Sequence, residues 1–496
     1  MITAQDHRAA DQLLQCPARP AGPVVDDEVG PQWIDGGARF WFAVGNGSGR
    51  RFVLVDPAAG TREPAFDHAR LAAALATASG QPVDPEALPL TDVRPTGGAV
   101  EFAALGGYWR CRLDDYSCEP AGFTPPGDPP EVLSPDGKVT VTRRGHDLWA
   151  RSLSDGRQWA LTTDGTPDHP YGTDPADPAG TADASRPHGI GLPHLPPAVV
   201  WSPDSTRVLT HRTDERGVRQ NRPAGARPAD GGVAAVPSQR YARAGDGTVA
   251  QAELVVLCVD NGTAVRAQAD PLLLPQMSPI ATKWAWWAED SSAVYYLARS
   301  RTLSLRRLDP ETGEVTTVLS EVGDTPVEPD HGPYEPPIVQ VLTDEVLWYS
   351  ERDGRGHLYR YDLHTGALLG QVTSGPWSVR QILRVDEARR VVYFTASGRV
   401  EEDPGRRTVC RAALDGPRFG SGSGFGFSFG FGFGLGSGFG SSSGFGFAEL
   451  TDDELDHAVT VADGQEYFLD SASTVDTPPV TRVRDWTGRV LVELSA

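Results

Sequence analysis

The sequence predicts an all-β protein, a β-propeller of eight blades with four antiparallel strands in each. Apolar and aromatic runs of four to seven residues alternate with Asp-Gly, Asn-Gly, Asp-Ser and Thr-Gly turns, which is typical of successive antiparallel hairpins. A phrase recurs as LSPDGK from Leu133, WSPDS from Trp201 and WAEDSS from Trp287. Helical periodicity is nearly absent, apart from FDHARLAAALATAS at 66–79.

Each repeat reads as a strand, a tight turn, two further strands, an Asp-x-x-x-Gly turn and a fourth strand, which is the pattern of a propeller blade. The expected units are 31–60, 91–122, 131–163, 197–267, 283–320, 338–373, 382–450 and 455–496. A single blade cannot cover both faces of its sheet, so neighbouring blades must stack. A β-sandwich is the main alternative, but it would not need this many near-equivalent hairpin units.

The 496 residues exceed the roughly 250 to 300 that a single compact core usually holds, which favours a repeat architecture or several domains. We divide the chain into an N-terminal extension, 1–30, and a propeller, 31–496. A Gly/Phe/Ser insertion, 416–447, interrupts the propeller. This composition cannot assemble a defined core, so we expect the insertion to be disordered.

The charge balance bears on the partners. Lys and Arg total 45 against 66 Asp and Glu, a net charge of −21, which argues against nucleic acid and anionic membranes as partners. The N-terminus lacks the apolar run of a signal peptide, and no segment offers about 18 consecutive apolar residues. We therefore expect a cytoplasmic protein.

The cysteines are odd in number and scattered, with no C-x-x-C pair, which indicates reduced thiols rather than a disulfide framework. They are Cys16, Cys111, Cys118, Cys258 and Cys410. The run ELVVLCVD places Cys258 on a strand, where we expect it to be buried.

Two serines of the insertion match the G-x-S-x-G pattern of a nucleophile elbow. They are Ser428 in GFSFG and Ser442 in GSSSG. In a segment made of glycine, phenylalanine and serine, such matches are expected by chance. A true elbow needs a strand before it, a helix after it, and an acid and a histidine downstream, and His457 is the only histidine that follows Ser428. We predict no catalytic residue.

His188 and His194 lack any metal-binding spacing, and a Pro-rich loop is the preferred interpretation. No metal or cofactor is predicted. Residues 215–250 carry five arginines from Arg216 to Arg240 and one more at Arg243. They could receive carboxylates or phosphates, but a solvated loop is favoured.

A group of aromatic residues follows the third copy of the phrase. It comprises Trp284, Trp286, Trp287, Tyr295 and Tyr296. Such a group could form a platform for a sugar or a base. Within a propeller, however, aromatic side chains that alternate inward are ordinary blade packing, so we expect core residues.

Four stretches resemble, in this order, the N-terminal propeller of dipeptidyl peptidase IV and its bacterial relatives in the prolyl oligopeptidase superfamily, the S9 serine peptidases. They are PPAVVWSPDSTRVLTHRTDERGV, QRYARAGDGTVAQAELVVLCVDNGT, WAEDSSAVYYLARSR and LTDDELDHAVTVADGQEYFLDSASTVDTPPVTRVRDWTGRVLVEL. The resemblance covers about residues 31–496, apart from the Gly/Phe/Ser insertion.

The resemblance implies an eight-bladed propeller that caps an α/β-hydrolase domain and restricts access to its Ser-Asp-His triad, so that only peptides reach it. The sequence stops where that hydrolase should begin. The implied role is therefore non-catalytic: a propeller that gates substrates and binds a peptide or protein ligand. A separate α/β-hydrolase chain could complete the peptidase, or the Phe-Gly segment could make the protein an interaction scaffold.

In this family, a pair of adjacent glutamates before a W-S-P-D-like strand holds the free amino terminus of the peptide, because paired carboxylates can accept charge-assisted hydrogen bonds from an ammonium group. The corresponding stretch, YGTDPADPAGTADASRPHGIGLPHLPPAVVWSPDS, contains no glutamate. Asp174, Asp177 and Asp183 are the candidate substitutes, and solvated loop acids are the alternative interpretation.

Overall fold

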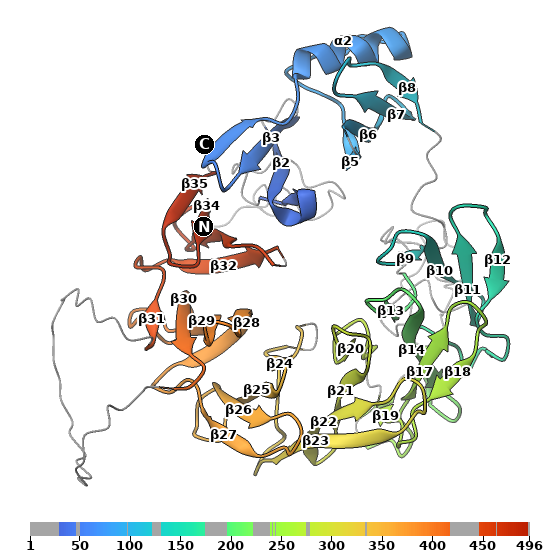
Figure 1. The fold of residues 1–496 in the computed structure, drawn as a ribbon, viewed down its shortest axis with the longest axis vertical. Helices are drawn as coiled ribbons and strands as arrows, with labels where there is room; N and C mark the ends of the chain where they lie inside the picture. The colour runs from blue at the N-terminus through green and yellow to red at the C-terminus, as the bar shows by residue number, and fades with distance from the viewer. Residues whose placement is uncertain are drawn as a thin grey trace, which may run out of the picture. The chain divides into compact units, whose positions relative to one another are not determined.

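The structure is a computed structural model, and it shows an all-β propeller of eight blades (Figure 1). The chain divides into two compact units, residues 1–123 with 372–496, and residues 124–371. The described residues are 29–45, 50–96, 98–121, 130–173, 196–221, 239–240, 242–243, 245–273, 278–332, 335–416, 446–462 and 464–494.

The first unit holds blades 1, 2, 7 and 8, each with strands paired in chain order. Blade 1 consists of β1 (Gln32–Ile34), β2 (Arg39–Gly45), β3 (Arg50–Asp56) and β4 (Thr61–Pro64). Blade 2 consists of β5 (Thr91–Thr96), β6 (Ala99–Ala104), β7 (Gly107–Arg112) and β8 (Cys118–Pro120). Blade 7 consists of β28 (Ser378–Asp386), β29 (Val391–Ser397), β30 (Arg407–Ala413) and β31 (Ala448–Glu449). Blade 8 consists of β32 (Asp456–Val461), β33 (Tyr467–Ser473), β34 (Val480–Asp485) and β35 (Val490–Glu493).

The second unit holds blades 3 to 6. Blade 3 consists of β9 (Val132–Leu133), β10 (Val139–Arg144), β11 (Asp147–Ser152) and β12 (Gln158–Ala160). Blade 4 consists of β13 (Val199–Trp201), β14 (Arg207–Asp214), β17 (Gln251–Cys258) and β18 (Ala264–Arg266). Blade 5 consists of β20 (Ala285–Trp287), β21 (Val294–Arg299), β22 (Thr302–Leu308) and β23 (Val315–Val322). Blade 6 consists of β24 (Val339–Val341), β25 (Glu345–Ser350), β26 (His357–Asp362) and β27 (Leu368–Gln371).

Blade 4 carries additions to its four strands. A short strand, β19 (Leu272–Leu273), pairs with the start of β17, and the chain between β14 and β17 forms a separate two-stranded ladder of β15 (Gln220–Asn221) and β16 (Gln239–Arg240). The predicted four-strand pattern is thus confirmed, and blade 4 is the most elaborated of the blades within the described residues.

Strand β4 extends blade 1 beyond the predicted end at residue 60. Its residues, TREP, are all exposed. No apolar alternation marks these residues and a proline ends the run, so a strand was not predicted there.

The turn of the recurring phrase joins neighbouring blades in the second unit. The backbone N–H of Asp136 in blade 3 donates to Ser205 Oγ in blade 4 at 3.1 Å, and that of Asp204 donates to Ser291 Oγ in blade 5, also at 3.1 Å. Both serines have φ of 62°, so serine is retained where glycine would be the easier choice. The hydroxyl therefore gives a reason for Asp-Ser turns in blades 4 and 5.

The first tryptophan of the repeated motif forms a second hydrogen bond between neighbouring blades. The indole N–H of Trp201 donates to the carbonyl of Val132 at 3.2 Å, and that of Trp287 donates to the carbonyl of Val200 at 3.1 Å. Trp201 and Trp287 are therefore each bonded to the first strand of the preceding blade. Burying an indole requires such a partner for its N–H.

The glycine of the Asp-x-x-x-Gly turn lies against the outer strand of the preceding blade. A Cβ at Gly313 would lie 2.3 Å from the Arg266 carbonyl oxygen, and one at Gly366 would lie 2.3 Å from that of Val318. Both glycines also have positive φ, 80° and 67°. Close approach and left-handed backbone together explain why the turn repeats with glycine.

Blades 1 and 8, from the two ends of the described chain, pack together within the first unit. Phe40, Val55, Tyr467 and Val483 share one buried core, and the Tyr467 hydroxyl donates to the Gly37 carbonyl at 2.5 Å. Among the described strands, β1–β4 pair only with one another, as do β32–β35. Side-chain packing, and not strand exchange, joins these two blades.

The predicted helix is confirmed as α2 (His68–Ser79), which begins after Asp67 and ends at Gly80. The Asp67 carboxylate accepts the backbone N–H of Arg70 at 3.0 Å, and Gly80 has the left-handed conformation of a helix C-cap. None of the helices in the described part of the chain is long and apolar enough to cross a membrane.

The predicted core aromatics are confirmed as packing residues. Trp287 and Tyr296 are buried in the core that blade 5 shares with blade 4. Tyr295 is buried in a second core on the other face of the sheet, and Trp284 and Trp286 are partly buried against that second core. The prediction for Cys258 was wrong in one respect. It lies on a strand, but it is only partly buried, because it is the last residue of β17, where the chain turns outward.

Candidate functional site

Residues 164–173 lie against strand β14 of blade 4. The backbone N–H of Gly172 donates to the carbonyl of His211 at 2.9 Å. The backbone N–H of Ala198 in turn donates to the carbonyl of Gly172, also at 2.9 Å. The described segment that ends at residue 173 and the one that begins at residue 196 therefore lie side by side on blade 4.

The three candidate aspartates, Asp174, Asp177 and Asp183, lie outside the described residues, as do His188 and His194. Their predicted roles stay predictions. The structure does, however, describe the part of blade 4 from which this segment departs.

A buried arginine forms the first half of the site. Arg212, on β14, is 9% exposed, and its guanidinium contacts the Asp164 carboxylate at 3.0 Å and donates to the Asp164 carbonyl at 2.7 Å. The Tyr171 hydroxyl donates to the same carboxylate at 2.9 Å. Burial and this hydrogen bond raise the pKa of Tyr171 to about 12. Although partial burial opposes it, contact with Tyr171, Arg212 and Arg266 holds the pKa of Asp164 below its usual value.

A second arginine holds the base of the β15–β16 ladder. Arg240 donates to the Asp168 carboxylate at 2.7 Å and to the backbone carbonyls of Glu215 and Val218 at 3.3 and 3.2 Å. The backbone of Glu215 also donates to the Asp168 carbonyl at 3.0 Å. Residues 164–173 and the ladder are therefore fastened together beside β14.

The Glu215 side chain differs from these paired acids. It is partly buried, and within the described part of the chain no hydrogen bond reaches its carboxylate. Burial raises its pKa, the nearby Asp168 adds to the rise, and Arg240 only partly offsets it. The nearby positive charge therefore does not fully offset the desolvation of the Glu215 carboxylate.

The predicted arginine cluster is largely engaged by acids of the same chain. Arg216 pairs with Asp214 at 2.7 Å and Arg219 pairs with Asp246 at 3.0 Å. With Arg240 bound to Asp168, the three described arginines between 216 and 240 each contact a carboxylate. The alternative of an anion site receives no support from these residues.

One buried histidine lies directly behind the site. His211, on β14, is fully buried, and its two ring nitrogens lie 2.8 Å from Ser278 Oγ and 3.1 Å from Thr213 Oγ1. Burial lowers its pKa to about 4, so the ring is neutral near pH 7. A neutral ring between two hydroxyls fixes β14 without adding a charge.

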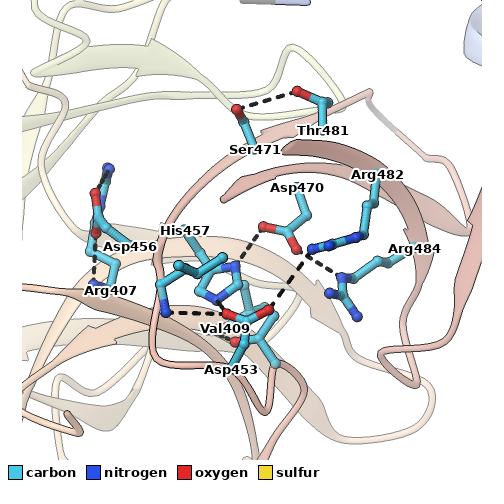
Figure 2. A network of polar contacts seen from close by, with 12 residues as sticks. Arg407, Val409, Asp453, Asp456, His457, Asp470, Ser471, Thr481, Arg482 and Arg484 are labelled. Carbon is cyan, nitrogen blue, oxygen red and sulfur yellow. Dashed lines mark hydrogen bonds and ion pairs between the residues drawn. The ribbon is translucent and has the colours of Figure 1, made fainter. Parts of the chain in front are cut away.

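A different charged network lies inside blade 8 (Figure 2). His457 Nδ1 lies 2.7 Å from Asp470 Oδ1, and the other oxygen of Asp470 accepts a hydrogen bond from Arg484 Nε at 2.7 Å. His457 Nε2 lies 2.8 Å from a carboxylate oxygen of Asp453, although the two atoms are not aligned for a hydrogen bond. His457 and Asp470 are both fully buried.

The contacts in this network indicate a structural and not a catalytic role for His457, the one histidine that follows the G-x-S-x-G matches. His457 is enclosed between two carboxylates and has no exposed surface on which to meet a substrate. Ser428 and Ser442 themselves lie outside the described residues. Within those residues, no cluster of three or more His, Cys, Asp or Glu side chains could hold a metal ion.

Sequence reasoning did not identify Arg212, His211 or Glu215 as site residues. Arg212 meets Asp164 across 48 positions of chain, so no local motif joins them. The stretch THRTDER held the only signal, since a histidine and an arginine within an otherwise apolar strand must find buried partners.

Comparison with known proteins gives one family match and a shared fold. The sequence model of the dipeptidyl peptidase IV (DPP IV) N-terminal region matches residues 195–479. This range includes every strand of blades 4, 5, 6 and 7, from β13 to β31, and the first two strands of blade 8.

Two solved structures have the same fold. Dipeptidyl peptidase 4 of Porphyromonas gingivalis aligns with a TM-score of 0.59 and 16% identity, over 95% of this chain and 60% of that one. A protein of Bacteroides ovatus, described as a dipeptidyl aminopeptidase IV, aligns with a TM-score of 0.59 and 16% identity, over 94% of this chain and 60% of that one. The chain thus spans about three fifths of the length of each structure, and at this identity the likeness concerns the fold alone.

Proposed function

The chain belongs to the family of the dipeptidyl peptidase IV N-terminal region, and from this premise we propose that it is the peptide-binding propeller of a dipeptidyl-peptidase-IV-like serine peptidase. In this role it holds the ligand and limits its access to a hydrolase domain, and it does not cleave the peptide itself. The binding site that we propose is the part of blade 4 around Glu215.

One observation carries this proposal. Glu215 is a partly buried carboxylate with a raised pKa and, among the described residues, no hydrogen-bonding partner. A carboxylate that has lost water without gaining a cation is stabilised by any cation that reaches it. The free amino terminus of a peptide is such a cation, and three N–H bonds can be donated from one ammonium group.

The neighbouring acids make this assignment selective. Asp164 is occupied by Arg212, and Asp168 is occupied by Arg240. The charge of each of these aspartates is already balanced by an arginine. Glu215 is therefore the acid of this cluster on which a cationic ligand would have the largest stabilising effect.

Calorimetric titration tests the proposal. A tripeptide with a free amino terminus and proline in second place should bind the chain, and its N-acetylated form should bind at least tenfold more weakly. Glu215→Gln should lower the affinity for the free peptide by about tenfold or more, because a neutral amide cannot pair with the ammonium group. Glu311→Gln is the matched control, since Glu311 is an exposed acid on a turn of blade 5.

Equal affinity for the free and acetylated peptides would refute recognition of the amino terminus. Equal loss of affinity in the Glu215 and Glu311 variants would refute the assignment of the site, because it would indicate a general effect of net charge. The two results separate the function from its location.

A second candidate is a propeller subunit that a separate α/β-hydrolase chain completes. A fluorophosphonate probe, which labels activated serines covalently, distinguishes the cases. We expect no labelling of the purified chain. Labelling of any of its own serines would contradict both candidates.

A further inference from the structure

Two cysteines of blade 2 lie directly opposite each other on neighbouring strands. Cys111 on β7 pairs with Cys118 on β8 in the antiparallel register. The next pair, Arg112 and Ser117, is hydrogen-bonded, with the Arg112 N–H donating to the Ser117 carbonyl at 3.0 Å. Because hydrogen-bonded and non-hydrogen-bonded pairs alternate along such a ladder, Cys111 and Cys118 form a non-hydrogen-bonded pair.

This position suits a covalent bond between the two sulfurs. In a non-hydrogen-bonded pair the Cα atoms lie about 4.5 Å apart, and both side chains lie on the same face of the sheet. Disulfides span Cα separations of about 4.4 to 6.8 Å. The two residues can therefore be bridged without moving the strands, although both are free thiols in this structure.

The surroundings separate the roles of the two thiols. Cys111 is fully buried in the core that includes Leu71 and Leu75 of α2, whereas Cys118 is partly exposed at the rim of that core. A reagent from solution therefore meets Cys118 first. Cys111 is then the neighbour that can attack the sulfur of Cys118.

A hydrogen bond connects the two thiols and affects their ionisation in opposite directions. It lowers the pKa of Cys111, against the opposing effects of burial and of Asp115. The same hydrogen bond, together with burial, raises the pKa of Cys118. In the singly ionised pair the thiolate is therefore Cys111, and Cys118 has to pass its proton to Cys111 before it can attack.

We propose that Cys111 and Cys118 are an oxidisable dithiol site that reacts with small-molecule disulfides. Cys118 attacks one sulfur of the small disulfide while its proton passes to Cys111, and a mixed disulfide forms as one small thiolate leaves. Cys111 then gives that proton to the departed thiolate and attacks the sulfur of Cys118. A second small thiolate leaves and takes a proton from solvent. This proton replaces the one that the cysteine pair released to solvent when it first ionised. One protein dithiol and one small disulfide thus become one protein disulfide and two small thiols.

The bond would fasten the outer edge of blade 2. It would close the turn of residues 113–117, where the Tyr116 hydroxyl accepts the backbone N–H of Asp67, the N-cap of α2, at 2.6 Å. Strand β8 also contacts α2 directly. Oxidation is therefore expected to tighten the attachment of α2 and to raise Tm by a few degrees.

Reaction of the full chain with glutathione disulfide, followed by alkylation under denaturing conditions and peptide mass spectrometry, tests the proposal. The wild type should lose two of its five alkylatable cysteines. It should yield one cross-linked peptide that joins Cys111 to Cys118. Cys111→Ser should instead accumulate a stable glutathione adduct on Cys118, because the resolving thiol is absent, and Cys118→Ser should leave Cys111 unmodified.

Cys258→Ser is the matched control, because Cys258 is also partly exposed but lies on a different blade. It should form the Cys111–Cys118 bond at the wild-type rate. If either serine variant folds poorly, alanine at the same position gives the same readout. A wild-type chain that keeps both thiols, keeps a glutathione adduct on Cys118, or joins either cysteine to a third one would overturn the proposal.

Discussion

Blades 4 and 8 each contain arginines bonded to aspartates, but they differ in how far water reaches the acids. In blade 8, the Asp470 side chain is 0% exposed and Arg484 is 7% exposed. In blade 4, Arg212 is similarly buried, at 10%, yet its partner Asp164 is 56% exposed. One network is sealed, and the other opens onto the surface.

This difference indicates what each network can do. In blade 8, Asp470 accepts from both His457 and Arg484, so its two oxygens are satisfied and no ligand can approach. In blade 4, Glu215 has a raised pKa and no such partner among the described residues. Satisfied buried charges stabilise or specify a fold, whereas a partly desolvated and uncompensated charge is available for binding.

The largest expected effect is at the sealed network. Asp470→Asn keeps the shape of the side chain but leaves the Arg484 guanidinium buried without a counter-charge. Breaking a buried pair in this way costs about 3 to 5 kcal/mol. Chemical denaturation should show this loss in the free energy of unfolding.

Asp164→Asn in blade 4 is the comparison variant. Because Asp164 is more than half exposed, its pair is screened by water, and the loss should be about 1 kcal/mol or less. Equal losses in the two variants would mean that the networks do not differ as their exposure indicates.

The next effect is on the pH dependence of stability, and it arises from His211. Its pKa of about 4 in the folded chain lies below the ordinary value of 6.5, so the unfolded chain takes up a proton between these values and the folded chain does not. Stability should therefore fall as the pH falls from about 6.5 to 4, by roughly 3 kcal/mol in total. Denaturation at several pH values measures this slope.

His211→Gln should remove that part of the slope, because glutamine does not titrate but can still bond to Ser278 and Thr213. Because the substitution also changes packing around a fully buried side chain, the pH slope of the unfolding free energy, and not its value at pH 7, is the quantity to compare. A slope unchanged from the wild type would show that His211 is not the titrating group.

The third effect is on peptide binding at Glu215. The ammonium group of a peptide needs the ionised carboxylate, and burial raises the pKa of that carboxylate. Affinity should therefore be constant near neutral pH and fall by up to tenfold per pH unit once the pH drops below the raised pKa. The fall should begin at a higher pH than for an ordinary glutamate. An affinity that is flat down to pH 4 would contradict the role of Glu215.

The smallest effect is expected in a third region, the Gly/Phe/Ser insertion between β30 and β31. Deleting residues 418–445 shortens a connection between paired strands, and loop length changes the free energy of closure by only about 1 to 2 kcal/mol. Thermal unfolding should shift little. A large loss of Tm would show that the segment is part of the fold.

Phe447, the last residue of the predicted insertion, sharpens this test. It lies within the described residues, with its ring 5.2 Å from that of Trp377 and the Arg399 guanidinium 5.1 Å above it. Phe447→Ala should therefore destabilise the chain more than deletion of all of 418–445 does.

The fold could be predicted from the sequence because the same turn motifs recur in successive blades of a propeller. The Asp-Ser and Asp-x-x-x-Gly turns are visible in the sequence because Ser205, Ser291, Gly313 and Gly366 each occupy a backbone position that few other residues tolerate. The packing of blade 1 on blade 8 was not predictable, because it joins Tyr467 to Gly37 across 430 positions.

The site was less predictable than the fold for a related reason. The resemblance directed attention to residues 174–183, which lie outside the described residues. The site that we propose centres instead on Glu215, which the sequence analysis included in a solvated loop. What distinguishes Glu215 is burial without a partner, and a sequence shows neither burial nor pairing.

A crystal structure of the chain bound to an Ala-Pro-Ala tripeptide tests the central claim most directly. The account predicts that the peptide lies on blade 4, with its amino group within hydrogen-bonding distance of the Glu215 carboxylate. A peptide bound elsewhere with Glu215 free, or an amino group that points into solvent, would contradict it.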